Sequence, residues 1–246
     1  MKIIISPAKK MKVDTDSMPH FDLPIFLKKT EELLQTLKSM SYEELKRLWK
    51  CNDSIAALNV GRLAQMDLYR NLTPAVLSYE GIQYQYMAPG VFTDQGCSYI
   101  QEHLRILSGF YGILKPFDGV TPYRLEMQSK LNLGEKRDLY DFWGSDLAKS
   151  LTEETDCIIN LASKEYSLAV SKYLPKTVRF VSCSFGEIIN GKVIEKGTMC
   201  KMARGEMVRF MAENQVTSVE QMKDFCCMNY HYAEEFSKAD GMVFVK

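Results

Sequence analysis

Three short apolar runs, each followed at once by small polar residues, constrain the fold of this chain more than any other feature. The runs and the hydroxyl residues that follow them are 2–5 with Ser6, 104–107 with Ser108, and 156–161 with Ser163. Apolar runs of this length, bounded by turn residues, are typical of buried strands. If the three strands are parallel neighbours, their carboxyl ends converge on one crevice. An ordinary turn at each strand end is the alternative.

The segment from residue 25 to residue 66 predicts helices. Apolar side chains recur at helical spacing over 25–40. Ser41-Tyr-Glu-Glu44 is a capping-box pattern that opens a second helix. Asn52 or Asp53 can cap a third. Residues 41–66 are therefore predicted to form a helical hairpin early in the chain.

The rest of the chain mixes predicted strands and helices without strict alternation. Residues 76–86 are expected to form a strand pair, or one strand with a bulge at Gly81, and Asn190-Gly191 predicts a hairpin turn. No internal repeat, low-complexity tract or linker divides the chain. We therefore expect an α+β (mixed α/β) fold over residues 1–246, in which one compact domain has a central mixed sheet wrapped by helices and includes the N-terminal helical hairpin.

Overall charge gives no reason for this chain to bind nucleic acid or membrane. Lys and Arg total 31 and Asp and Glu total 31, so any polyanion must be bound by a local patch. The seven cysteines contain no Cys-x-x-Cys pair, and no apolar run approaches the ~20 residues of a membrane span. With no signal peptide recognised at the start, we expect a cytoplasmic protein with reduced thiols and no membrane partner.

Basic side chains gather near the predicted strand ends and on one later helix. Lys9 and Lys10 follow the first strand, and a helix predicted to start near Lys201 carries Arg204 on the same face, with Arg209 offset. A helix that starts near Ser163 would offer free backbone N–H groups to phosphate. Scattered surface charge is the alternative for the basic residues, and a plain helix cap is the alternative for Ser163.

The loop that follows Ser108 combines both signs of charge and could carry chemistry. Lys115 and Arg124 suit phosphate, whereas Asp118 or Glu126 could act as a general base if buried beside a ligand. The candidate catalytic residues are Glu126, Asp118, Ser108 and Tyr111. The three histidines lack metal-ligand spacing and no phosphate-loop or dinucleotide motif is present, so the sequence indicates no metal site and no cofactor.

Taken in order along nearly the whole chain, several motifs resemble the YaaA family of bacterial peroxide-stress resistance proteins. They are Ile5-Ser-Pro-Ala-Lys9, Leu107-Ser-Gly-Phe-Tyr-Gly-Ile-Leu-Lys-Pro116, Pro122-Tyr-Arg-Leu-Glu-Met127, Phe142-Trp-Gly144, Asn160-Leu-Ala-Ser163 with Glu165-Tyr166, and Lys201-Met-Ala-Arg-Gly205. The resemblance implies a cytoplasmic protein that helps cells survive hydrogen peroxide by keeping free iron low and limiting oxidative damage to DNA. It also implies one compact domain with a positively charged cleft, a helix-hairpin-helix-like element and DNA binding.

The chain departs from the family pattern at three places. Met202 replaces a lysine, Gln128 stands where glycine is usual, and the turn at residues 50–53 lacks the glycines that bring hairpin amides close to phosphate. Gly61 and Arg62 are the nearest substitute in the predicted hairpin.

Two functions follow as hypotheses. The first is a DNA-binding stress protein that recognises shape rather than sequence through phosphate contacts. Its predicted phosphate-binding residues are Lys9, Lys10, Arg62, Lys115, Arg124, Ser163, Lys201, Arg204 and Arg209. The second is an enzyme that acts on a nucleotide or nucleic-acid base in the same cleft, which allows a small nucleotide-like ligand. Direct iron sequestration is the weakest alternative because the chain lacks a ligand cluster for it.

Overall fold

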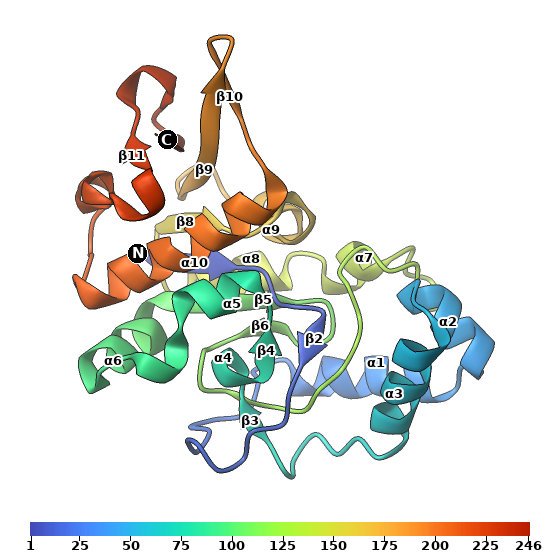
Figure 1. The fold of residues 1–246 in the computed structure, drawn as a ribbon. Helices are drawn as coiled ribbons and strands as arrows, with labels where there is room; N and C mark the ends of the chain where they lie inside the picture. Colours follow the sequence, from blue (N-terminus) through green and yellow to red (C-terminus); the bar gives the residue numbers. More distant parts are fainter.

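Three neighbouring parallel strands form the centre of the main sheet in the computed structural model, which describes residues 1–246 (Figure 1). Strand β1 (Lys2–Ile5) lies between β5 (Leu104–Ser108) and β8 (Cys157–Leu161), and Ile5 pairs in register with both Ile106 and Leu161. Ile3, Ile4 and Ile5 are fully buried because helices cover both faces of the sheet. The three strand ends that the sequence singled out therefore meet at one edge.

Five further strands complete an eight-stranded mixed sheet, and two small sheets lie beside it. The five are β6 (Gly112–Leu114), β9 (Arg179–Ile189), β10 (Lys192–Ile194), β11 (His231–Tyr232) and β12 (Gly241–Val245). The main path runs β11-β12-β9-β8-β1-β5-β6, with β10 paired to β9 across the predicted Asn190-Gly191 turn. The small sheets pair β2 (Lys10–Met11) with β4 (Tyr79–Glu80) and β3 (Thr73–Pro74) with β7 (Gly119–Val120).

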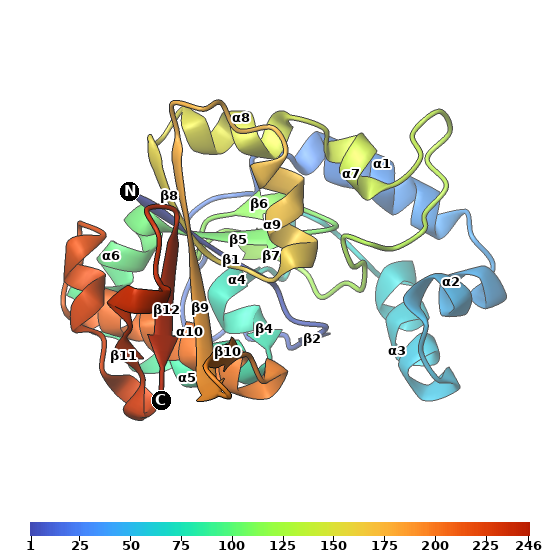
Figure 2. The same ribbon diagram turned by 90° about the horizontal axis from the view of Figure 1, so that it is seen from above.

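Helices lie on both faces of this sheet, as Figure 2 shows, with α8 and α9 on one side and α5, α6 and α10 on the other. The helices are α1 (Leu27–Lys38), α2 (Tyr42–Trp49), α3 (Asp53–Ala64), α4 (Ala75–Ser78), α5 (Ile82–Met87), α6 (Asp94–His103), α7 (Leu139–Trp143), α8 (Asp146–Thr152), α9 (Lys164–Ser171) and α10 (Gly197–Glu213). Single 3-10 turns occupy 89–91, 220–224, 227–229 and 234–236. None of these helices has the length and apolar character needed to cross a membrane. The predicted α+β class is confirmed.

The predicted helical hairpin is present and stands away from the sheet (Figure 2). The Ser41 side chain caps α2, with Glu44 completing the capping box, and the Asn52 side chain accepts the backbone N–H of Ile55 to cap α3. Between them Lys50 adopts a left-handed conformation with φ of 45°. Glycine is favoured at such a position, so the hairpin closes with a strained lysine where the sequence lacks glycine.

The prediction for residues 76–86 is wrong. The segment is mainly helical, with α4 and α5 separated by the two-residue strand β4. Gly81 is extended at the start of α5 and forms no bulge. Helix α5 packs closely on α10, since a Cβ at Gly205 would lie 2.2 Å from the Gln83 carbonyl oxygen. This long-range helix contact favours the helical conformation over the local strand pattern.

Candidate functional site: a cleft at the carboxyl ends of the parallel strands

A cleft of about 490 Å³ lies where β1, β5 and β8 end. Five separate segments form it: 6–10 after β1, 80–84 at β4 and α5, 123–126 in the loop after β7, 163–166 at the start of α9, and Lys201 with Arg204 on α10. Small-molecule sites have cavities of a few hundred Å³ and often lie at this edge of a parallel sheet. Of the predicted phosphate-binding residues, the cleft brings together Lys9, Lys10, Arg124, Ser163, Lys201 and Arg204.

A pair of serines joins two of the strand ends. The Ser6 Oγ accepts the backbone N–H of Ser163 at 2.8 Å and donates to the Ser163 Oγ at 3.2 Å. Ser163 is the N-cap residue of α9, yet its side chain makes no capping hydrogen bond. Its hydroxyl is turned to Ser6, so it fixes the edge of the cleft rather than the helix start.

Ser108 and Tyr111 support the cleft from beneath and do not line it. Ser108 Oγ accepts the backbone N–H groups of Phe110 and Tyr111 at 3.1 and 2.8 Å and lies 2.6 Å from the Tyr123 hydroxyl. Both residues are buried. Gly109 allows the loop to return closely, because a Cβ there would lie 2.6 Å from the Leu125 carbonyl oxygen. The two candidate catalytic residues Ser108 and Tyr111 therefore lie outside the cleft lining and contact the loop that carries residues 123–126.

Glu126 binds two of the cations of the cleft. Its Oε2 lies 2.8 Å from Lys9 Nζ, and its Oε1 lies 3.6 Å from Arg124 Nη2. Glu80 pairs with Lys10 at 3.2 Å. These contacts explain why an acidic residue occurs in a basic cleft: Glu126 holds the Arg124 guanidinium while Lys9, whose side chain is 66% exposed, stays open to solvent.

Lys201 and Arg204 have no acidic partner. Helix α10 begins at Gly197, one turn earlier than predicted, and the two residues lie three apart on its cleft-facing side. Arg204 Nε is buried and lacks any hydrogen-bond acceptor. A buried donor without a partner is costly, by ~1–3 kcal/mol, and charged donors more so. The site thus contains a guanidinium that makes no hydrogen bond to another group of the protein.

The three buried side-chain donors without partners in the molecule all lie in or beside this cleft. They are Arg204 Nε, Arg124 Nε and Trp49 Nε1. Trp49 ends helix α2, and its carbonyl oxygen accepts Arg124 Nη2 at 3.4 Å, so the helical hairpin adjoins the cleft wall. All three unpartnered atoms are N–H donors. Of the three, those of Arg124 and Arg204 belong to residues that line the cleft, where a ligand with oxygen acceptors would lie beside them.

Glu165 is a cleft residue that the sequence analysis named within a family motif but did not count among the candidate site residues. It lies in the first turn of α9, forms no ion pair, and accepts the backbone N–H of Gln128 at 3.2 Å. Burial raises the pKa of its carboxyl, and the nearby Glu126 raises it further. Its place two residues after Ser163, at a strand-to-helix junction, was the available sequence signal.

Lys115 and Asp118 lie at the opposite edge of the sheet, so their predicted place in the cleft is wrong. Strand β6 runs antiparallel to β5 and carries the chain back to the amino end of β5 before Lys115 is reached. Asp118 is buried and accepts the backbone N–H of Lys115 at 2.8 Å. Burial raises the pKa of Asp118 to about 6.

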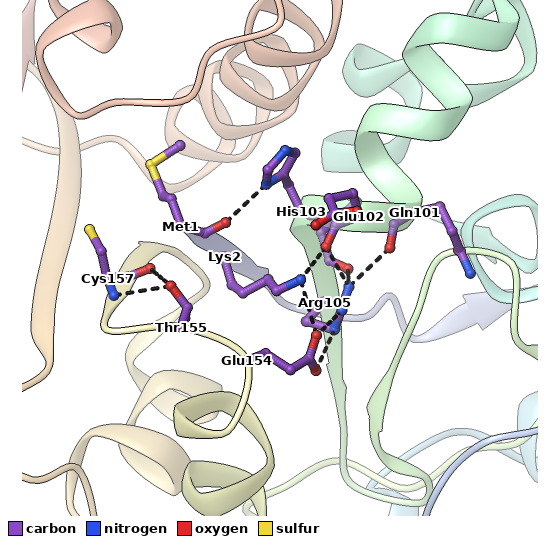
Figure 3. A network of polar contacts seen from close by, with 10 residues as sticks. Met1, Lys2, Gln101, Glu102, His103, Arg105, Glu154, Thr155 and Cys157 are labelled. Carbon is purple, nitrogen blue, oxygen red and sulfur yellow. Dashed lines mark hydrogen bonds and ion pairs between the residues drawn. The ribbon is translucent and has the colours of Figure 1, made fainter.

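The second cavity, which Lys115 lines, is built over an internally paired network (Figure 3). Arg105 is 3% exposed, pairs with Glu154, and donates to the carbonyl oxygens of Gln101, Glu102 and Leu104. Lys2 Nζ lies 3.0 Å from the same Glu154. The network joins the amino ends of β1 and β5 to the segment before β8. Lys2 and Arg105 share the one carboxylate and direct their other donors to backbone carbonyl oxygens, which is typical of a structural cluster.

Arg62 and Arg209 also lie outside the cleft. Arg62 Nη2 donates to the Met11 carbonyl oxygen at 3.0 Å, and this contact ties α3 to β2. Arg209 Nε pairs with Glu213 Oε1 at 2.8 Å one turn along α10. Both guanidinium groups are engaged locally. No group of three or more His, Cys, Asp or Glu side chains is arranged to hold a metal ion, and all seven cysteines are free thiols.

Comparison with known proteins identifies the family. The family described as "Peroxide stress protein YaaA" matches residues 1–236. The chain belongs to the YaaA family. UPF0246 proteins of Lachnoclostridium phytofermentans and Pediococcus pentosaceus are 56% and 53% identical over 246 residues, covering all of this chain and 96% and 98% of theirs. A third, from Desulfitobacterium hafniense, is 54% identical over the same length and covers 98% of that protein. Membership of the YaaA family supports a role in peroxide stress and confirms the resemblance found in the sequence.

Proposed function

We propose that this YaaA-family protein binds DNA through the phosphates that its cleft accepts, and that this binding limits iron-dependent oxidative damage in the cytoplasm. The observation that carries the proposal is Arg204, a guanidinium in the cleft with a buried Nε and no acceptor or acidic partner. Guanidinium groups match phosphate oxygens closely, and such contacts fix a protein on DNA without reading its sequence.

Local charge supports the same proposal. The cleft is lined by five cations (Lys9, Lys10, Arg124, Lys201 and Arg204) and three carboxylates (Glu80, Glu126 and Glu165), a surplus of two positive charges on a protein whose formal net charge is zero. A concentrated positive region raises the local concentration of a polyanion even when overall charge is balanced. The helical hairpin extends this wall through the contact between Trp49 and Arg124.

Phosphate contacts also suggest how binding would relate to iron. A protein that neutralises DNA phosphates releases the cations condensed on them. Ferrous ions held there would be displaced from the strand, and radicals formed from peroxide and iron would then arise farther from the sugars and bases. On this proposal the protein needs no iron ligands of its own.

The direct test is DNA affinity measured across salt concentration. We expect binding of a labelled duplex to weaken steeply between 50 and 200 mM salt, with each lost phosphate contact reducing the logarithmic slope by about 0.9. Arg204→Ala should lower both affinity and slope. Arg209→Ala on the same helix is the matched control and should change neither, since Arg209 lies outside the cleft. Absence of duplex binding, or an affinity independent of salt, would contradict the proposal.

A second candidate function is an enzyme that acts on a nucleotide or nucleic-acid base. The observation that favours it is Glu165, a carboxyl with a raised pKa beside a cationic cleft, since perturbed carboxyls at such sites act as general acids or bases. Survival of peroxide by cells that carry each variant separates the two. If protection follows DNA affinity across Arg204→Ala and Glu165→Gln, binding is the function. If Glu165→Gln abolishes protection while DNA affinity persists, catalysis is.

A further inference from the structure

Some charged side chains of the cleft form ion pairs with one another, and the others form none. Lys10 is matched by Glu80, and Lys9 and Arg124 are matched by Glu126. What remains is a cationic pair from α10, Lys201 and Arg204, and one carboxyl from α9, Glu165. A complementary ligand therefore carries an anionic group and, separately, a hydrogen-bond donor.

The size and lining of the cleft limit that ligand further. A cavity of about 490 Å³ is of the size that encloses small molecules. The bases of a paired duplex are stacked inside the helix, so a phosphate-binding wall contacts only the duplex backbone. Three tyrosines, Tyr84, Tyr123 and Tyr166, contribute to the lining. Aromatic rings beside phosphate-binding cations are typical of sites that take an unstacked base.

We propose that the cleft takes a single unpaired nucleotide unit, with its phosphate against Arg204 and Lys201 and an N–H donor of its base edge directed to Glu165. This inference rests on the DNA-binding function proposed above and names the part of the nucleic acid that enters. The same nucleoside phosphate chemistry is offered by a nucleotide extruded from a strand and by a free nucleoside monophosphate. Extrusion is easiest where the base is already unpaired.

Glu165 gives this site a preference among bases. An ionised carboxylate accepts hydrogen bonds, and the amino group of cytosine is a common partner of Glu and Asp. Thymine has no amino group and presents carbonyl oxygens on either side of its single ring N–H. An unpaired cytosine should therefore bind more tightly than an unpaired thymine at the same position.

The experiment compares three labelled duplexes of equal length: fully paired, with one unpaired cytosine, and with one unpaired thymine. We expect the cytosine probe to bind roughly tenfold more tightly than the paired duplex, because the cost of unstacking is already met. We expect about threefold to tenfold discrimination against thymine, the range for one hydrogen bond. Deoxycytidine monophosphate should compete for the site better than deoxycytidine or inorganic phosphate alone.

Variants test separately the phosphate contact at Arg204 and the base contact at Glu165. Arg204→Ala and the charge-conserving Arg204→Lys should weaken competition by the monophosphate, and Glu165→Gln should lower the ratio of cytosine to thymine affinity. Glu206→Gln, a partly buried carboxyl of α10 outside the cleft, is the matched control and should preserve that ratio. Thermal melting of each variant shows whether a lost effect reflects unfolding, and Arg204→Lys keeps the test valid if Arg204→Ala does not fold.

Each outcome has one meaning. Equal affinity for all three duplexes, with no competition by the monophosphate, overturns the inference and leaves DNA binding standing. Failure to bind any duplex while the monophosphate binds supports the nucleotide site and overturns the proposed DNA-binding function. Binding of neither overturns both.

Discussion

The hydroxyl of Ser6 accepts the backbone N–H of Ser163 at 2.8 Å, and this contact joins the end of β1 to the start of α9 across 157 positions of sequence. Replacing Ser6 with alanine leaves that N–H without a partner in a partly buried place. We expect Ser6→Ala to lower the free energy of unfolding by ~1–3 kcal/mol, measured in urea. Ser163→Ala keeps the N–H bond and loses only the longer hydroxyl contact, so it should have a smaller effect. Equal losses would show that the N–H bond contributes little.

Gly205 permits the close packing of α10 on α5. A Cβ at this position would lie 2.2 Å from the Gln83 carbonyl oxygen and 2.9 Å from the Met87 nitrogen, both backbone atoms. Gly205→Ala should therefore destabilise the protein by ~1–3 kcal/mol or more, and should also weaken DNA binding because α5 lines the cleft. Gly197→Ala, at the first position of the same helix with no atom within 4 Å, should stabilise by ~0.4–1 kcal/mol by restricting the unfolded chain. Calorimetric melting of both variants compares them directly, and a stable Gly205→Ala protein would refute the packing argument.

Asp118 should make stability depend on pH. Its pKa is raised from 3.8 to about 6 by burial, so the folded state holds the proton more tightly than the unfolded state. The protonated Asp118 carboxyl therefore makes its full contribution to the free energy of unfolding below about pH 4, and this contribution is lost as pH rises to about 6. The free energy of unfolding lost in this range amounts to ~3 kcal/mol. Asp118→Asn imitates the protonated acid and retains an acceptor for the Lys115 N–H. The free energy of unfolding of Asp118→Asn, relative to that of the natural chain, should rise between pH 4 and pH 7. If the two free energies change in parallel with pH, the pKa of Asp118 is not raised in the folded protein.

Glu126 should oppose the binding of anions. Its carboxylate engages Lys9 and Arg124, so Glu126→Gln frees two cations at the cleft wall. We expect tighter duplex binding and a steeper dependence on salt, measured by fluorescence anisotropy. Glu32→Gln, an exposed position on α1, changes net charge equally and serves as the control. The prediction fails if both variants tighten binding to the same extent.

The sequence identified the three strand ends because local patterns determine where strands stop. Ser6 and Ser163 follow apolar runs that can be recognised from the sequence alone. The capping residues Ser41 and Asn52 bond to backbone groups within one helical turn, so local sequence also predicts them. Lys115 was misplaced for a reason of topology. Its position depends on β6 turning back along β5, which no local pattern of residues 112–114 reveals.

Two other features needed the folded chain. Residues 76–86 are helical where they meet α10, and that contact depends on Gly205, more than one hundred positions away. The folded chain also shows that Lys201, Arg204 and Glu165 are the charged residues of the cleft that form no ion pair. Which charges of the cleft remain unmatched depends on distances between segments remote in sequence, so the sequence analysis counted both Arg204 and Arg209 as phosphate-binding although Arg209 pairs with Glu213 outside the cleft.

The five segments that wall the cleft are spread from residue 6 to residue 204. Global unfolding therefore dismantles the cleft, and an occupant holds together five segments that are remote in sequence. At one hundred times its Kd a ligand stabilises the folded state by ~2.7 kcal/mol. Amide hydrogens that exchange by global unfolding, including those of strand β12 that no ligand would touch, should then exchange about one hundred times more slowly. Occupancy of a small site would thus slow every proteolytic cleavage that requires global unfolding.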